Sequence, residues 1–175
     1  MLKRLLVTSL IFACLSVSSL SAMELIKSDA PFNERWKLKI NGITYHFSSD
    51  SDVNECNYGL GFTYSLGDLD CKWSLLDGLK TAVEVDAYND SYEDLGYSIG
   101  VAFQKPLTDK LPLDWGLHVG LIHEDHLAEK SGLFLHPYVF PYLETTFHFP
   151  VNARVLAFPP VHNDGIIALQ LIVKF

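Results

Sequence analysis

Residues 95–104 read LGYSIGVAFQ, and large apolar side chains alternate with small ones along this stretch. The large side chains are Leu95, Tyr97, Ile99, Val101 and Phe103, and the positions between them hold glycine, serine, alanine and glutamine. Successive side chains of a β-strand point to opposite faces, so this period of two predicts a strand. Glycine is a poor choice for a strand face exposed to water. The small face therefore favours a narrow lumen, and the large face favours contact with lipid.

The same alternation recurs along the rest of the chain. It is strong at 58–66, 79–88, 115–122 and 167–175, and weaker at 36–47, 133–146 and 151–158. Together with the first stretch, these segments make eight strands. We therefore predict an all-β fold, an eight-stranded antiparallel up-and-down transmembrane β-barrel with a lumen lined by small and apolar residues. A soluble barrel of the lipocalin type is the alternative.

Local changes in the pattern add detail to this prediction. The apolar parity shifts at Asn41-Gly42, which predicts a β-bulge in the first strand. In the sixth strand, large aromatic residues are expected to face the lumen and make it apolar: Phe134, Tyr138, Phe140 and Tyr142. We predict solvated outer loops at 48–57, 89–94, 123–132 and 159–165, and periplasmic turns at 67–78, 106–113 and 149–150.

The first 22 residues are predicted to be an export signal. Lys3 and Arg4 precede an apolar stretch that ends in small residues at Ser21 and Ala22. Residues 23–35 then form a short N-terminal segment, and 36–175 form the barrel. No apolar run of about 18 residues follows the signal, which excludes a helical span. We expect an integral, monomeric protein of the Gram-negative outer membrane.

Charge, cysteine and histidine content narrow the function. The chain carries 13 basic and 21 acidic residues, and without the signal segment 11 basic residues remain, a net charge of −10. Such a surface repels phosphate backbones, so no nucleic acid is expected as a partner. Cys56 and Cys71 are expected at opposite ends of a strand, too far apart for a disulfide. The spacing of His118, His123 and His126 does not fit a zinc site, and we expect no metal or cofactor.

Short motifs between residues 40 and 175 occur in an order that resembles a known family. They are Ile43-Thr44-Tyr45-His46, Tyr58-Gly59-Leu60-Gly61-Phe62, Asp90-Ser91-Tyr92, Pro137 with Pro141, and Phe158-Pro159 followed by Asn163-Asp164-Gly165. In this order and spacing the chain resembles the outer-membrane lipid A palmitoyltransferases (PagP). The resemblance implies transfer of a palmitoyl or similar chain from a phospholipid donor to a lipid A acceptor.

The resemblance also implies the catalytic positions His46, Asp90 and Ser91. Strand parity places His46 toward the lumen near the outer rim, and Asp90 ends the third strand at the same rim. Ester acyl transfer benefits from a base, a hydroxyl and a group that stabilises charge. An Asp-Ser pair after a strand is also common turn chemistry. Whether Ser91 forms a covalent intermediate is left open by the sequence.

Two further sets of residues are expected to handle the lipid. Small residues of the fourth strand should leave room for an acyl chain: Gly96, Ser98 and Gly100. Prolines lack the N–H group that a strand ladder needs, and they predict a lateral gate in the wall: Pro137, Pro141 and Pro159.

The chain departs from the family in places, and rival functions remain. Only 23–35 is available for the family's N-terminal amphipathic helix, and Asn41 and Asn57 stand where the family has prolines. A non-enzymatic adhesin or structural barrel would have a polar lumen, for which the candidates are Lys80, Glu84, Asp86 and Arg154. A lipid A deacylase is the other rival, because His46-Phe47-Ser48 fits a His-x-Ser motif.

Overall fold

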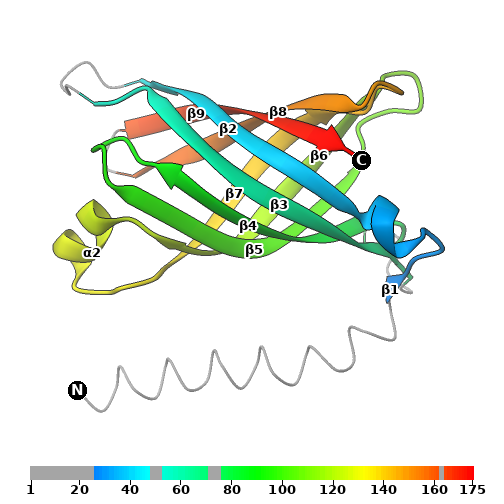
Figure 1. The fold of residues 1–175 in the computed structure, drawn as a ribbon, viewed down its shortest axis with the longest axis horizontal. Helices are drawn as coiled ribbons and strands as arrows, with labels where there is room; N and C mark the ends of the chain where they lie inside the picture. The colour runs from blue at the N-terminus through cyan, green and yellow to red at the C-terminus, as the bar shows by residue number, and fades with distance from the viewer. Residues whose placement is uncertain (1–25, 48–52, 71–75, 162–163) are drawn as a thin grey trace, which may run out of the picture.

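A computed structural model describes residues 26–47, 53–70, 76–161 and 164–175. Within these ranges, one short α-helix and nine strands are found (Figure 1). The strands are β1 (Ile26–Lys27), β2 (Trp36–His46), β3 (Cys56–Leu69), β4 (Lys80–Asn89), β5 (Leu95–Pro106), β6 (Leu113–His123), β7 (His136–Thr145), β8 (Val151–Val161) and β9 (Asp164–Lys174). The helix is α2 (Asp125–Ser131), and a 3-10 turn, η1 (Phe32–Arg35), precedes β2.

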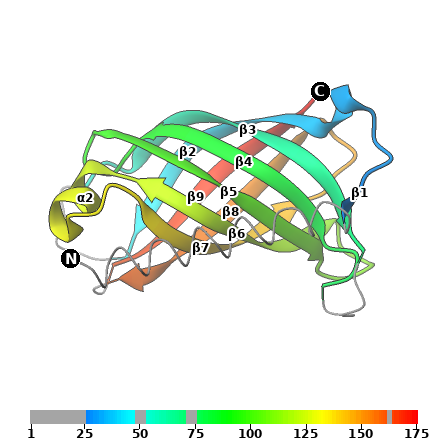
Figure 2. The same ribbon diagram turned by 90° about the horizontal axis from the view of Figure 1, so that it is seen from below.

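Strands β2 to β9 form a closed, all-antiparallel, up-and-down barrel, which confirms the predicted fold. Each strand pairs with its neighbours in sequence, and the barrel closes because β2 also pairs with β9, from Lys37 opposite Lys174 to His46 opposite Ile166. In both ribbon views, α2 and the C-terminus lie at opposite ends of the barrel (Figures 1 and 2). We call these the α2 end and the C-terminal end.

The outside of the barrel is apolar, as the strand parity predicts, but the lumen also buries charged side chains, which the predicted lining of small and apolar residues did not include. Side chains such as Leu60, Ile99 and Val139 are exposed on the outer surface, whereas Glu84 and Arg154 are almost completely buried in the lumen. Water-soluble proteins show the opposite distribution, since lysine, glutamate and arginine are rarely buried unless they are paired. Among the described residues, no helix is long and apolar enough to cross a bilayer.

The predicted bulge in the first barrel strand is present. The register of β2 shifts between Asn41 and Ile43 against β3, and between Asn41 and Thr44 against β9. Because of this shift, both Thr44 and His46 point into the lumen, where they are buried. The bulge therefore places the side chains of the predicted site.

A second irregularity separates β7 from β8. These strands pair only near the C-terminal end, and the last pair toward the α2 end joins Tyr142 to Leu156. Beyond this pair, β7 carries Pro137 and Pro141, and β8 carries Pro159. The three prolines predicted to form a gate thus lie on facing segments of β7 and β8 that no backbone hydrogen-bond ladder joins.

The N-terminal segment and the cysteines complete the description. β1 pairs with β3 near the C-terminal end, and the ring of Phe32 in η1 packs against Trp36 and Tyr64. The predicted export signal, 1–22, lies outside the described residues. Cys56 is exposed at the start of β3, and Cys71 lies outside the described residues, so the absence of their disulfide stays a prediction.

Candidate functional site

A layer of paired charges fills the middle of the lumen. Lys39 Nζ lies 2.6 Å from Glu84 Oε2 and 2.7 Å from Asp86 Oδ2. Arg154 bridges Glu84 and Glu144, with N–O distances of 2.8 and 2.7 Å. Burial of these charges is tolerated because each has an opposite charge in contact. The layer closes the lumen midway, so a cavity on its α2 side has a polar floor.

A cavity of about 650 Å³ occupies the lumen between this layer and the α2 end. Its apolar lining comes from β6 to β9 and includes Ile122, Tyr138, Phe140, Leu156, Phe158, Ile166 and Ala168. Polar residues on the side of β2, β3 and the segment after β4 form what we call the polar wall, with Asn41, Thr44, His46, Asn57 and Ser91, and other strands add Asp86, Ser98, His118 and Gln170. The cavity thus offers both apolar and polar lining, as an amphiphilic ligand requires.

His46 and Ser91 meet at the polar wall. The His46 Nε2 atom lies 2.9 Å from Ser91 Oγ, and the His46 side chain is buried. His46 ends β2, and Ser91 follows β4, so the antiparallel order brings both to the same end of the barrel on either side of β3. This confirms the predicted proximity of the two residues. A histidine nitrogen at hydrogen-bond distance from a hydroxyl is the arrangement needed for general-base catalysis.

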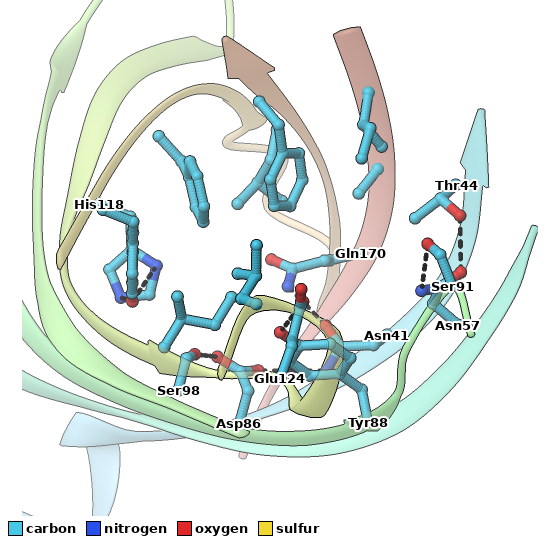
Figure 3. Close-up of a pocket in the computed structure, with 18 of the residues that line it drawn as sticks. Asn41, Thr44, Asn57, Asp86, Tyr88, Ser91, Ser98, His118, Glu124 and Gln170 are labelled. Atoms are coloured by element: carbon cyan, nitrogen blue, oxygen red, sulfur yellow. Dashed lines mark hydrogen bonds between the residues drawn. The ribbon is translucent and has the colours of Figure 1, made fainter. Parts of the chain in front are cut away.

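Two further side chains extend this pair. Asn57 Nδ2 donates to Ser91 Oγ over 3.3 Å, and Thr44 Oγ1 donates to Asn57 Oδ1 over 2.6 Å. Figure 3 shows Thr44, Asn57 and Ser91 joined in this chain at one side of the lumen. The sequence prediction did not include Asn57 in the site. Its inward parity at the start of β3 was the available signal, since that strand lies beside the one carrying His46.

Asp90 has a different position from the one that a catalytic triad would need. Its Oδ1 atom accepts the backbone N–H groups of Tyr92 and Asp94, at 2.8 and 2.9 Å. This is the turn chemistry that the sequence offered as an alternative. Its Oδ2 atom is buried and, like His46 Nδ1, has no hydrogen-bond partner within the described residues. The structure therefore joins His46 to Ser91, and Asp90 to the loop backbone.

The predicted acyl pocket is only partly formed by the residues expected there. Ser98 lines the cavity, whereas Gly96 and Gly100 do not. A Cβ atom on Gly96 would lie 2.7 Å from the Tyr88 ring, and one on Gly100 would lie 2.8 Å from Tyr138 Oη. Large side chains of neighbouring strands thus occupy the room that the two glycines leave.

The aromatic residues around β7 also divide into two groups. Tyr138, Phe140 and Tyr142 face the lumen, as predicted. The prediction for Phe134 was wrong, because this residue precedes β7 and its side chain is 63% exposed. Its ring packs on His123, with 4.3 Å between the ring centroids. The predicted strand covers 133–146, whereas β7 begins at His136, so Phe134 lies before the alternation of the strand begins.

The outer loop after β6 is not the simple solvated loop that was predicted, because it contains α2. The helix ends at Ser131 and is capped by Gly132, whose φ of 70° is the left-handed conformation common at helix C-termini. His126 stacks on Tyr92, the neighbour of Ser91, with 3.9 Å between the ring centroids. His126, Leu127 and Lys130 line the cavity. The helix therefore forms part of the cavity wall next to the His46–Ser91 pair.

One carboxyl group beside α2 is buried. Tyr88 Oη donates to Glu124 Oε1 over 2.8 Å, and Glu124 lines the cavity. Burial raises the pKa of the Glu124 carboxyl, the hydrogen bond from Tyr88 opposes this, and the negative charge of Asp90 adds to it. In the part of the chain that the structure describes, no three histidine, cysteine or acidic side chains gather as a metal site.

The cavity reaches the gap between β7 and β8. Pro137 and Val139 line it, although the Val139 side chain is 51% exposed on the outer surface of the barrel. Ile43 and Leu169, beside the bulge of β2, also line the cavity and are exposed outside, so the wall is thin at both places. The predicted gate segment and the cavity are thus continuous.

A scan against protein-family models gives no match for this chain, and a search of curated proteins gives none either.

Proposed function

We propose that this protein is an acyltransferase of the outer membrane, which moves a palmitoyl or similar chain from a phospholipid to lipid A. The observation that carries the proposal is the His46–Ser91 pair, 2.9 Å apart, in the wall of a half-apolar cavity. The apolar wall suits an acyl chain, because each buried methylene contributes about 0.8 kcal/mol. The polar wall suits the ester group, which has to meet a base and a hydroxyl.

The outer surface of the barrel supports a membrane location. Large apolar side chains are exposed around the barrel, on strands such as β3, β5 and β9. A soluble monomer rarely exposes so much continuous apolar surface. In a bilayer, the same surface faces hydrocarbon, and all backbone groups of a closed barrel are paired except at defined gaps.

The gap between β7 and β8 gives the donor a route from the membrane to the cavity. Over this segment no ladder joins the two strands, and the cavity extends to it. An acyl chain can then leave the bilayer sideways without crossing the polar outer loops. Pro137, Pro141 and Pro159 keep the segment open because a proline cannot donate to a ladder.

The two rival functions are distinguished by particular features. The charged layer of Lys39, Glu84 and Arg154 agrees with a purely structural barrel, but such a barrel has no need for a half-apolar cavity beside a histidine–serine pair. For the deacylase, Ser48 of the His-x-Ser motif lies outside the described residues, and the acyltransferase is favoured by the hydrogen bond between His46 and Ser91.

Reconstitution tests the proposal. The full barrel in vesicles containing lipid A and a phospholipid with a labelled acyl chain should label lipid A. Ser91→Ala and His46→Ala should lower the rate by about 10²-fold or more, because general-base catalysis contributes that much. The matched controls are Ser65→Ala and His148→Ala near the C-terminal end. Equal labelling by the wild type and Ser91→Ala would contradict the proposal.

A further inference from the structure

The hydrogen-bond chain at the α2 end has a definite direction. Thr44 Oγ1 donates to Asn57 Oδ1, so the Asn57 NH₂ group faces Ser91 Oγ and can only donate to it. Thr44 and Asn57 are both more than nine-tenths buried, so solvent competes little for these groups. The amide is therefore held in one orientation by its own neighbour.

This direction decides where the Ser91 proton points. Oγ has one proton and two lone pairs, and one lone pair accepts from Asn57; its other hydrogen bond, to His46 Nε2 over 2.9 Å, is the one in which the hydroxyl can donate. His46 Nδ1 then carries the ring proton. Nδ1 and Asp90 Oδ2 both lack a hydrogen-bond partner among the described residues.

We propose that Asn57, held by Thr44, is a positioning residue that makes Ser91 the nucleophile, so that the reaction passes through an acyl–Ser91 ester. This inference rests on the proposed acyltransferase function. Ser91 Oγ forms a bond to the donor's carbonyl carbon, and its proton passes to His46 Nε2. The donor's ester bond breaks, and the leaving lysophospholipid oxygen takes that proton.

The second half of the reaction restores the site. A lipid A hydroxyl attacks the acyl–Ser91 ester, and its proton passes to His46 Nε2. The bond from Ser91 Oγ to the acyl carbon breaks, and Oγ regains a proton from His46. The two halves balance without any further reactant. The donor must therefore bind and release its lysophospholipid before transfer to the acceptor is complete.

Near-isosteric variants separate this role from a structural one. In Asn57→Asp, an ionised carboxylate can only accept, so it draws the Ser91 proton away from His46. Asn57→Ala removes the donor without adding a competitor, and it should be the less severe change. Thr44→Val frees the amide to turn over, whereas Thr44→Ser keeps the hydroxyl and should restore the wild-type rate. A purely structural role would instead make the smaller alanine at least as damaging as aspartate.

The test measures acylation alone, with the folded full chain in detergent micelles and the p-nitrophenyl ester of palmitic acid as substrate. The wild type and Thr44→Ser should release a burst of about one nitrophenol per protein, and intact-protein mass spectrometry should find one acyl group on Ser91. The acylation rate should fall by about tenfold in Thr44→Val and further in Asn57→Asp, the scale of one lost hydrogen bond. Heat-dependent gel mobility checks that each barrel is folded.

The outcomes separate two kinds of failure. If the wild type acylates Ser91 and Asn57→Asp does so at the same rate, or faster than Asn57→Ala, the role of Asn57 is wrong. If lipid A is labelled in a Ser91-dependent way but no acyl–Ser91 ester forms, Ser91 is not the nucleophile. If the wild type neither acylates nor labels lipid A, the proposed function itself has failed.

Discussion

At the scale of single residues, the two carboxylate oxygens of Asp90 have different surroundings. Oδ1 holds the loop that carries Ser91, through the backbone N–H groups of Tyr92 and Asp94, whereas Oδ2 is buried without a hydrogen-bond partner among the described residues. A buried carboxylate oxygen without a partner is costly, and such atoms often belong to functional sites. A catalytic role for Asp90 would therefore rest on its negative charge and not on a hydrogen bond to His46.

Asp90→Asn separates these two contributions. Asparagine keeps an oxygen for the Tyr92 and Asp94 N–H groups, so the loop should stay folded, but the negative charge is lost. We expect the transfer rate to fall by about 10²-fold, on the scale of a positioned acid or base. The measurement is labelled acyl transfer in vesicles. Wild-type activity in Asp90→Asn would leave Asp90 as a turn residue only.

Ser98 should influence acyl length, because it is the one predicted pocket residue of β5 that lines the cavity. Ser98→Met fills part of the cavity, and each methylene that loses its place costs about 0.8 kcal/mol. The variant should therefore favour donors with shorter chains, measured with phospholipids that differ only in acyl length. The outward-facing Ile99→Met is the control. An unchanged length profile in Ser98→Met would place the limit on chain length elsewhere.

At the scale of strands and loops, the gap between β7 and β8 is the feature that a lipid gate would use. A Pro141→Cys, Ala157→Cys pair, in a background with Cys56 and Cys71 replaced by serine, occupies the next ladder position after Tyr142–Leu156. Oxidation should close the gap and lower acyl transfer by about tenfold or more, and a reductant should restore it. Full activity of the oxidised protein, with cross-linking verified by mass spectrometry, would exclude this gap as the route.

The strands could be predicted from the sequence because the two faces of each strand have different surroundings, the outside and the lumen of the barrel. The residue types therefore alternate with a period of two over about ten residues. The bulge at Asn41-Gly42 was visible for the same reason, as a break in that period. The helix α2 was not, since its seven residues carry a single large apolar side chain, Leu127, and its place depends on the cavity. Parity also states only which face a residue occupies. It could not reveal that Tyr88 fills the space beside Gly96.

For the candidate site too, the sequence predicted which residues lie near one another but not their individual contacts. Parity and strand order placed His46 and Ser91 at one rim, and the structure brings them into contact. The hydrogen bonds of Asn57 and Asp90 depend on side-chain directions in a turn and on the stagger of adjacent strands. The sequence indicated the turn chemistry of Asp90 and the inward parity of Asn57, but not which atoms would meet. The division of lumen between a charged layer and a cavity likewise depends on which side chains meet across the barrel.

At the scale of the whole molecule, the charged layer is the internal brace of a barrel with an apolar exterior. Arg154→Met leaves Glu144 without its cation and Glu84 with Lys39 alone, and breaking a buried pair in this way costs about 3–5 kcal/mol. Urea unfolding of the protein in detergent should show this loss. Lys80→Met removes a half-exposed lysine from the buried Asp114, which keeps its hydrogen bond from Gln104, and it should cost less than Arg154→Met. Equal effects would contradict a bracing role for the layer.

The central claim is that this barrel transfers an acyl chain to lipid A through His46 and Ser91. Mass spectrometry of lipid A tests it most directly, in Gram-negative cells that lack such an activity and express either the wild type or Ser91→Ala at equal outer-membrane levels. The wild type should add the mass of one long acyl group, such as palmitoyl, and Ser91→Ala should not. A loss of acyl mass would identify a deacylase, and unchanged lipid A in cells with folded wild-type protein would contradict the claim.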